Sequence, residues 1–374
     1  MKNNQTYIIA EIGSNHDGNL EKALEMVKNA HRAGADAVKF QTFQVDKLLN
    51  PLVFEENNAH KENWVYSELK KVEIDEKFHQ VIKELCLKLG LDFISAPFDE
   101  DSLAITARYC HKLKIASSEI TNLPLLSLVG AYNLPVILST GISTLGEVEN
   151  AISALIRGGV TDLSLLHCVS LYPLTAQDAN LTVIQTLRQS FGLPTGFSDH
   201  SLDDTMPLAA VALGARLIEK HVTLKREERI FDHPHSMEFE DFKAMVDKIR
   251  VLETALGDGI KKIGAQELEI KKASNKSLFA AGELKPGTPI TPSHIKGVRP
   301  LIGIPVKHLQ DIIGKKVKRP IPPIIPYSGR TSSGRSYYTG PHGINSTPGQ
   351  SIKRTFRPPP LVARGGAPKK CQTG

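Results

Sequence analysis

Two histidines each end a short apolar run, and their side chains could bind a metal ion. His200 ends the run TGFSDH, and His221 lies near the end of the run RLIEKHVT. Neutral imidazoles, with oxygen ligands in the remaining positions, suit a catalytic divalent cation such as Mn, Co, Zn or Fe. The alternative is a pair of hydrogen-bonded histidines without a metal, and the residue types alone leave it open.

Two lysines, Lys39 and Lys114, interrupt other apolar runs, where a buried ammonium group needs an anionic partner. A phosphate or carboxylate ligand could supply that charge. Three serines end or follow neighbouring runs and could donate hydrogen bonds to the same anion: Ser117, Ser139 and Ser198. Two alternatives remain open. Either lysine could pair with Glu11, Glu119 or Glu219 in a structural network, or one lysine could form a Schiff base.

Glu11 is the candidate for proton transfer, because a carboxylate in a cationic pocket can take up a proton or hold a water molecule. Tyr172, in SLYPL, and Asp232, in FDHPHS, lie in segments where sugar hydroxyls could be bound.

These residues need a scaffold that brings the ends of several strands together. Eight apolar runs alternate with amphipathic helical patterns, which favours parallel strands joined by crossovers. The runs span residues 7–13, 37–43, 92–98, 112–117, 135–140, 163–168, 195–200 and 216–223. We therefore predict an α/β fold of the (β/α)8 TIM-barrel type, in which the carboxyl ends of the strands converge on one face. That face would also receive His167, which lies near the end of the sixth run.

The predicted domains are a barrel over residues 1–257, a linker over 258–274 and a small, mostly β domain over 275–323. Residues 324–374 are rich in Pro, Gly and Ser and are predicted to be a disordered basic tail. The charged segment 46–71 is predicted to be a long loop that serves as a lid or interface.

Charge and composition exclude several classes of protein. The 374 residues carry a net charge of +6, but residues 324–374 hold eight Lys or Arg and no acidic residue, so subtracting eight leaves −2 on residues 1–323. We therefore expect no nucleic-acid partner. The first residues lack a signal-peptide core and a membrane span, which predicts a cytoplasmic protein without a membrane partner. Four cysteines without CxxC spacing indicate neither a disulfide framework nor a structural zinc site.

Eight motifs in order over residues 6–320 resemble the N-acetylneuraminate (sialic acid) synthase family, which includes the pseudaminic acid, legionaminic acid and spore-coat sugar synthases. The motifs are AEIGSNHDG, GADAVKFQTF, KIASSEI, ILSTGIS, LHCVSLYP, GFSDHS, GARLIEKHVT and SLFAAGELKPGTPIT. The resemblance implies condensation of phosphoenolpyruvate with an N-acetylated aldose, such as N-acetylmannosamine, to a nine-carbon 2-keto acid and phosphate. It also implies a barrel followed by an antifreeze-like (SAF) domain, in a domain-swapped homodimer.

The resemblance also assigns roles to residues. It implies that His200 and His221 bind a divalent cation, most often Mn, with Mg or Co as alternatives, and that Glu11 is the acid/base carboxylate. The expected phosphoenolpyruvate contacts are Lys39, Lys114, Ser117, Ser139 and Ser198. The expected amino-sugar contacts are Gln41, Glu119, Tyr172, Asp232 and, from the partner subunit, Arg299.

One departure from the family pattern favours a second hypothesis. Ala96 stands where the family offers phosphate a hydroxyl, and one lost hydrogen bond to a charged group costs about 1.5–3 kcal/mol. The second hypothesis is a catalytically impaired barrel of the same family that binds sugar acids or phosphate. A third, a synthase for phosphorylated sugars, would need extra arginines for a second phosphate, and the strand ends have none.

Overall fold

The computed structural model describes residues 5–50, 62–228 and 232–324. The chain divides into two compact units, Met1–Lys261 and Lys262–Gly374. The predicted tail, 324–374, lies outside the described residues apart from Ile324.

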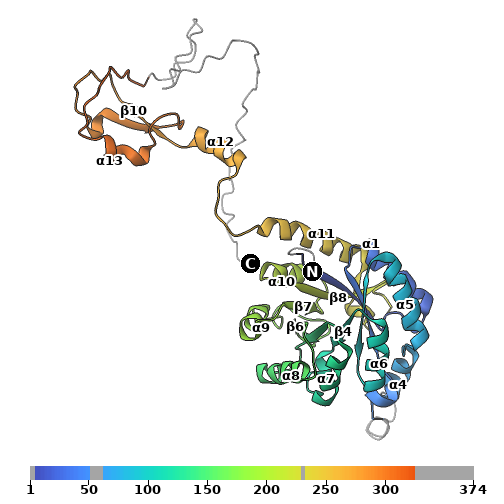
Figure 1. Cartoon of the computed structure of the whole chain (residues 1–374). Coiled ribbons are helices and arrows are strands. Elements are labelled where there is room, and N and C mark those ends of the chain that lie inside the picture. Colours follow the sequence, from blue (N-terminus) through green and yellow to red (C-terminus); the bar gives the residue numbers. More distant parts are fainter. Residues whose placement is uncertain (1–4, 51–61, 229–231, 325–374) are drawn as a thin grey trace, which may run out of the picture. The chain divides into compact units, whose positions relative to one another are not determined.

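The first unit is built around eight parallel strands that close into a barrel (Figure 1). Each strand pairs with the next along the chain, and the pairing of β1 with β8 closes the ring. The strands are β1 (Tyr7–Gly13), β2 (Ala37–Thr42), β3 (Asp92–Pro97), β4 (Lys112–Ile115), β5 (Val136–Ser139), β6 (Leu163–Cys168), β7 (Thr195–Asp199) and β8 (Leu217–Thr223). The predicted (β/α)8 TIM barrel is confirmed.

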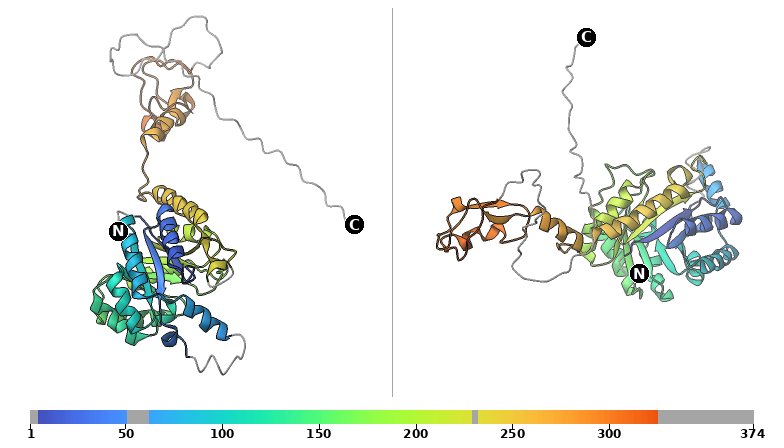
Figure 2. Two further views of the ribbon diagram at one scale, coloured as in Figure 1. Left: turned by 90° about the vertical axis from the view of Figure 1, so that its right-hand side faces the viewer. Right: turned by 90° about the horizontal axis from the view of Figure 1, so that it is seen from above.

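Helices connect the strands and lie outside them, as two further views show (Figure 2). The main ones are α1 (Leu20–Arg32), α5 (Glu76–Leu89), α6 (Glu100–Tyr109), α7 (Leu123–Val129), α8 (Leu145–Arg157), α9 (Val183–Phe191), α10 (Thr205–Ala212) and α11 (Phe239–Leu256). Local sequence sets their ends. Asp75 accepts a hydrogen bond from the Phe78 amide at the start of α5, and Gly90 ends that helix at φ +71°.

The barrel interior has an apolar layer and a polar layer. The apolar layer consists of Ile9, Ala37, Ile94, Ile137, Leu166 and Leu217. Since side chains alternate between the two faces of a strand, the residues two positions further along each strand also point inward. Many of these are polar, and they form the buried layer toward the carboxyl ends: Glu11, Lys39, Ser139, Cys168, Ser198 and Glu219.

The segment predicted as a long loop contains two helices, so that prediction is wrong for the part that the structure describes. These are α2 (Val45–Leu48) and α4 (Glu62–Lys71), while residues 51–61 lie outside the described residues. Tyr66 and Leu69, three positions apart on α4, pack against a small cluster that contains Phe43. This apolar contact explains the helix, because it buries one face of a charged segment.

The second unit contains α12 (Ala265–Ser274), an antiparallel pair β10 (Ser277–Ala280) and β11 (Ile295–Val298), and α13 (Leu309–Ile312). Helix α12 occupies most of the predicted linker. The core of this unit is small and consists of Ala280, Leu284 and Val317.

Gly196 on β7 allows close approach of β8, and its replacement tests the barrel packing. A Cβ atom at Gly196 would lie 2.2 Å from the Leu217 carbonyl oxygen and 2.7 Å from the Leu217 Cβ. Gly196→Ala should lower the free energy of unfolding by about 1–3 kcal/mol, measured by urea unfolding, because the strands must shift apart. Gly146→Ala is the control, since a Cβ atom there would meet nothing within 4 Å beyond its chain neighbours and the backbone of its own helix. Equal stability of the two variants would contradict this account.

Candidate active site and metal centre

Two carboxylates and a lysine form a buried charged cluster inside the barrel. The Lys39 ammonium lies 2.9 Å from Glu11 Oε1 and 3.7 Å from Glu219 Oε1. The Gln41 amide donates to Glu11 Oε1 at 3.1 Å, and the Ser198 hydroxyl donates to Glu219 Oε1 at 2.9 Å. The structural pairing that the sequence left open for Lys39 is therefore present, with Glu11 and Glu219 as its partners.

The two carboxylates differ in their affinity for a proton. Burial and the nearby Glu219 carboxylate raise the pKa of Glu11 to about 7, although Lys39 opposes the shift. Burial also acts against ionisation of Glu219, but Lys114 and Lys39 outweigh it and hold the pKa of Glu219 below its ordinary value. Glu11 can therefore hold or release a proton near neutral pH.

Lys114 lies in the same interior, near the Glu219 carboxylate, but its hydrogen bonds go to neutral groups. Its ammonium donates to the Ser139 hydroxyl at 2.6 Å and to the Ile115 carbonyl at 2.9 Å. Burial lowers the pKa of Lys114. Ser117, at the start of a short 3-10 turn, accepts a hydrogen bond from the Gly141 amide at 3.0 Å.

His200 and His221 lie side by side at the carboxyl ends of β7 and β8, with ring centroids 5.5 Å apart. The Tyr172 ring packs 4.1 Å from the His200 ring. His200 Nδ1 is 2.9 Å from the Val169 carbonyl oxygen, which leaves Nε2 for another ligand. Burial lowers the pKa of His221 to about 3, so this imidazole is neutral, as a metal ligand must be.

His221 joins Asp232 and His235 in a group that could hold a cation. One ligand atom from each of the three residues lies within 4.8 Å of the others. His221 Nδ1 and His235 Nε2 are buried without a hydrogen-bond partner. Buried polar atoms in folded proteins are normally paired, so these two nitrogens fit a metal ion. Burial acts to raise the pKa of Asp232. The neighbouring His221 and His235 outweigh this effect, so the pKa of Asp232 lies below its ordinary value.

Sequence reasoning missed His235. It lies in FDHPHS, two residues beyond His233, in a segment without regular spacing. The pairing of β9 (Met237–Glu238) with the end of β8 brings this segment back over the barrel, with Met237 opposite Val222.

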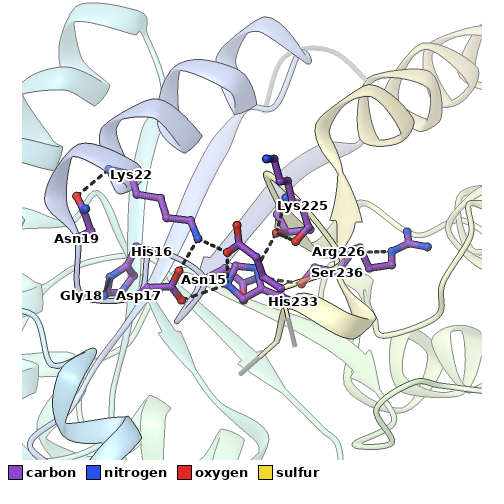
Figure 3. Close-up of polar contacts among 12 residues, drawn as sticks. Asn15, His16, Asp17, Gly18, Asn19, Lys22, Lys225, Arg226, His233 and Ser236 are labelled. Atoms are coloured by element: carbon purple, nitrogen blue, oxygen red, sulfur yellow. Dashed lines mark hydrogen bonds and ion pairs between the residues drawn. The ribbon is translucent and has the colours of Figure 1, made fainter. Parts of the chain in front are cut away.

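A hydrogen-bond network fixes the segment that carries Asp232 and His235, and Figure 3 shows Asn15 and Ser236, which belong to it. The Asn15 side chain donates to the Val222 carbonyl at 2.9 Å and to the Ser236 hydroxyl at 2.8 Å. Ser236 in turn donates to the Asp232 carbonyl at 2.6 Å. The loop after β1 thus positions the backbone of the segment after β8.

A second group, Asp17, Glu228 and His233, also has the composition of a cation site, but Lys22 already occupies it. The Lys22 ammonium pairs with Asp17 and Glu228, and His233 Nε2 is 3.1 Å from Asp17 Oδ1 (Figure 3). These contacts join α1 to the loop after β8 and assign the group a structural role.

His16 makes the stability of the barrel depend on pH. Its Nδ1 accepts a hydrogen bond from the Gly18 amide at 3.1 Å, and burial lowers the pKa of His16 from 6.5 to about 4. The unfolded chain binds the proton first, so this contribution is present above pH 6.5 and is lost as the pH falls toward 4. The loss between pH 6.5 and 5 is about 2 kcal/mol.

The test is urea unfolding at pH 7 and pH 5. His16→Gln should show a smaller difference between the two values than the wild-type chain. His31→Gln, at an exposed position of α1, is the control and should keep the wild-type difference. An unchanged difference in His16→Gln would contradict the assignment.

Three predicted residues lie apart from these contacts. Glu119 binds the Asn122 side chain at 2.9 Å in the turn after β4. Arg299 is exposed after β11 and belongs to the second unit. His167 does not join the pocket, because its neighbours Leu166 and Cys168 occupy the inward positions of β6. It stacks on Phe197 and bonds to the Ala179 carbonyl at 2.8 Å.

Among the described residues, no helix is long and apolar enough to cross a membrane. The three described cysteines, Cys86, Cys110 and Cys168, are free thiols and buried.

Known proteins share both units of this chain. It is 41% identical over 320 residues to the N,N'-diacetyllegionaminic acid synthase of Legionella pneumophila, which covers 83% of this chain and 90% of that protein. The pseudaminic acid synthase of Helicobacter pylori is 35% identical over 83% of this chain and 93% of its own length. The crystal structure of the N-acetylneuraminic acid synthetase of Leptospira borgpetersenii matches with a TM-score of 0.65 and 36% identity, over 71% of this chain and 90% of that one.

Two family models match successive parts of the sequence. The SAF domain model matches residues 275–323, and the NeuB family model matches residues 26–261, which is more than half of the chain. The chain belongs to the NeuB family.

Proposed function

We propose that this protein is a nonulosonic acid synthase. It condenses phosphoenolpyruvate with an N-acetylated aldose, N-acetylmannosamine or a related amino sugar, and releases phosphate. The proposal rests on two groups of side chains that are buried together at one end of the barrel. In one group, two lysines lie among hydroxyls, and in the other, imidazoles lie beside a carboxylate. The similarity to legionaminic and pseudaminic acid synthases supports the same chemistry.

The lysines and hydroxyls would bind phosphoenolpyruvate. If Glu11 holds its proton, Lys39 and Lys114 face a single negative charge, on Glu219, and an anion would balance the remaining positive charge. Ser139 and Ser198 lie beside these groups, and Ser117 extends the same wall of the pocket. This arrangement favours anion binding over a Schiff base, because charge and donors are spread over several strands.

The carbon skeleton would form in one addition. The methylene carbon of phosphoenolpyruvate attacks the aldehyde carbon of the open-chain sugar, and the aldehyde oxygen becomes a hydroxyl by taking a proton. Water then adds to the carbon that bears the phosphate. Cleavage of the bond between this carbon and the phosphate oxygen releases phosphate and leaves the ketone. Glu11 would exchange the protons of these steps, since its pKa of about 7 allows both states.

His200 and His221 would hold a divalent cation, with Mn as the first choice and Mg or Co as alternatives. Such a cation supplies Lewis-acid polarisation of the aldehyde when it is bound. Tyr172 packs against His200, and Asp232 lies 3.6 Å from His221. Both residues therefore suit the sugar side of the pocket, together with Gln41. The family resemblance adds Glu119, which lies in the turn after β4. Arg299 from a second copy of the chain would complete the sugar contacts in a domain-swapped homodimer.

The test measures phosphate release from phosphoenolpyruvate. Release should require both an N-acetylated sugar and a divalent cation, and mass spectrometry over a panel of mannose-type and diamino-sugar acceptors should identify one nine-carbon acid. Calorimetric binding of phosphoenolpyruvate without turnover of any acceptor would favour the impaired barrel instead. This second candidate is supported by Ala96, which is buried on β3 opposite Gln41 and has no hydroxyl to offer a phosphate.

A further inference from the structure

The His235 imidazole lies beside His221, one of the two histidines of the candidate metal centre. The His221 ring centroid is 5.5 Å from that of His200 and 5.3 Å from that of His235. His221 therefore stands between two other imidazoles. The Tyr172 ring, 4.9 Å from the His235 ring and 4.1 Å from the His200 ring, covers the same group.

The ligand atoms of His221, Asp232 and His235 are close enough for one cation. They lie within 4.8 Å of one another. Ligand bonds of about 2.0–2.2 Å place neighbouring ligand atoms roughly 3–4 Å apart, so small side-chain rotations would close the set. Asp232 can reach both imidazoles, because its Oδ1 is 3.3 Å from His235 Nε2 and its Oδ2 is 3.6 Å from His221 Nδ1.

The histidine nitrogens lack any other partner. His221 is 7% exposed and His235 is 9% exposed, and His221 Nδ1 and His235 Nε2 make no hydrogen bond. The 3.3 Å contact of His235 with Asp232 does not have hydrogen-bond geometry. An unsatisfied buried polar atom costs about 1–3 kcal/mol, and a bound cation would remove that cost for both nitrogens.

Hydrogen bonds hold the segment that carries His235 next to the end of β8. The His235 amide bonds to the Asp232 carbonyl at 3.2 Å, and that carbonyl also accepts from Ser236. Asn15 then ties Ser236 to the end of β8. A ligand fixed in this way loses little entropy when a metal binds.

We infer that His235 is a third imidazole ligand of the cation, beside His200 and His221, with the Asp232 carboxylate as an oxygen ligand. Three imidazoles and one carboxylate suit Co²⁺, Zn²⁺, Fe²⁺ or Mn²⁺, whereas Mg²⁺ prefers an all-oxygen shell. The centre would therefore hold a transition metal in the absence of substrate and discriminate against Mg²⁺. This inference rests on the proposed function for the location of the centre and names which residues set its metal preference.

The experiment titrates the metal-free full chain with Co²⁺ and follows the visible absorption of the bound ion, with calorimetry for Co²⁺ and Mg²⁺. Wild type should bind Co²⁺ far more tightly than Mg²⁺. His235→Gln should weaken Co²⁺ binding at least about 10–100-fold and change the absorption spectrum. Pulsed electron paramagnetic resonance with Mn²⁺ should detect one imidazole fewer in the variant than in wild type.

Two variants keep the inference falsifiable. His31→Gln removes an exposed histidine and should bind Co²⁺ as wild type does. Metal-free His235→Gln should remain folded, which its thermal unfolding checks, because the imidazole nitrogen has only a 3.3 Å contact with Asp232 and no well-aligned hydrogen bond to lose. A folded His235→Gln with wild-type Co²⁺ affinity and spectrum would overturn the role of His235. If the wild-type chain still released phosphate in a cation-dependent way, the proposed function would stand.

Discussion

His221→Gln is expected to lower the rate of phosphate release from phosphoenolpyruvate at least about 10³-fold, because His221 is central to the candidate metal centre. It is the imidazole that adjoins His200, His235 and Asp232. Lewis-acid stabilisation by a bound cation is worth several kcal/mol, and about 4 kcal/mol corresponds to a factor of 10³. The measurement is steady-state phosphate release at saturating Co²⁺ or Mn²⁺, with metal content determined in parallel.

The matched control is His167→Gln, which removes an imidazole at a similar height in the barrel wall but on the outward face. His167 contacts Phe197 and the Ala179 carbonyl, so its replacement should cost stability rather than turnover. A His221→Gln enzyme that retained metal and most of its rate would refute the metal centre.

The sequence predicted the scaffold well, because each strand is a compact apolar run between helical patterns. All eight strands are present, and their ends differ from the predicted runs by at most two residues. In a barrel, the carboxyl ends of successive strands must share one rim. That geometry is enough to bring Glu11, Lys39 and His221 together from segments far apart in the chain.

The positions of the strand ends do not predict whether a side chain points into the barrel or away from it. The position of His167 near the end of its run predicts a place in the pocket, yet Leu166 belongs to the apolar interior layer. Alternation along the strand therefore turns His167 outward. Counting from one interior residue on each strand separates His167, which points outward, from Ser198, which points inward.

Residues of irregular segments were the hardest to place. His235 has no periodic neighbours, and only the β8–β9 pairing and the Asn15 network bring it to His221. The charge of the segment 46–71 predicts a loop, although Tyr66 and Leu69 give α4 one apolar face. Long-range contacts of this kind override local composition.

The two buried lysines should respond differently to replacement, because their partners differ. Lys39→Met leaves Glu11 and Glu219 facing each other without their shared cation, and breaking a buried ion pair in this way costs about 3–5 kcal/mol. Lys114→Met removes an ammonium that contacts only the Ser139 hydroxyl and the Ile115 carbonyl. Lys114→Met also removes a charge that favours the Glu219 carboxylate, but it breaks no direct ion pair, so its free energy of unfolding should fall by less than that of Lys39→Met.

Substrate binding should nevertheless suffer in both variants. A hydrogen bond to a charged group is worth about 1.5–3 kcal/mol, so KM for phosphoenolpyruvate should rise roughly 10- to 150-fold in each. Urea unfolding of the substrate-free chain gives the stabilities, and initial rates over a phosphoenolpyruvate series give KM. Equal stability of Lys39→Met and Lys114→Met would show that the two carboxylates do not need the Lys39 ammonium to stay buried. An unchanged KM in both variants would instead show that neither ammonium faces the anion, because a group that contacts phosphoenolpyruvate cannot be removed without weakening its binding.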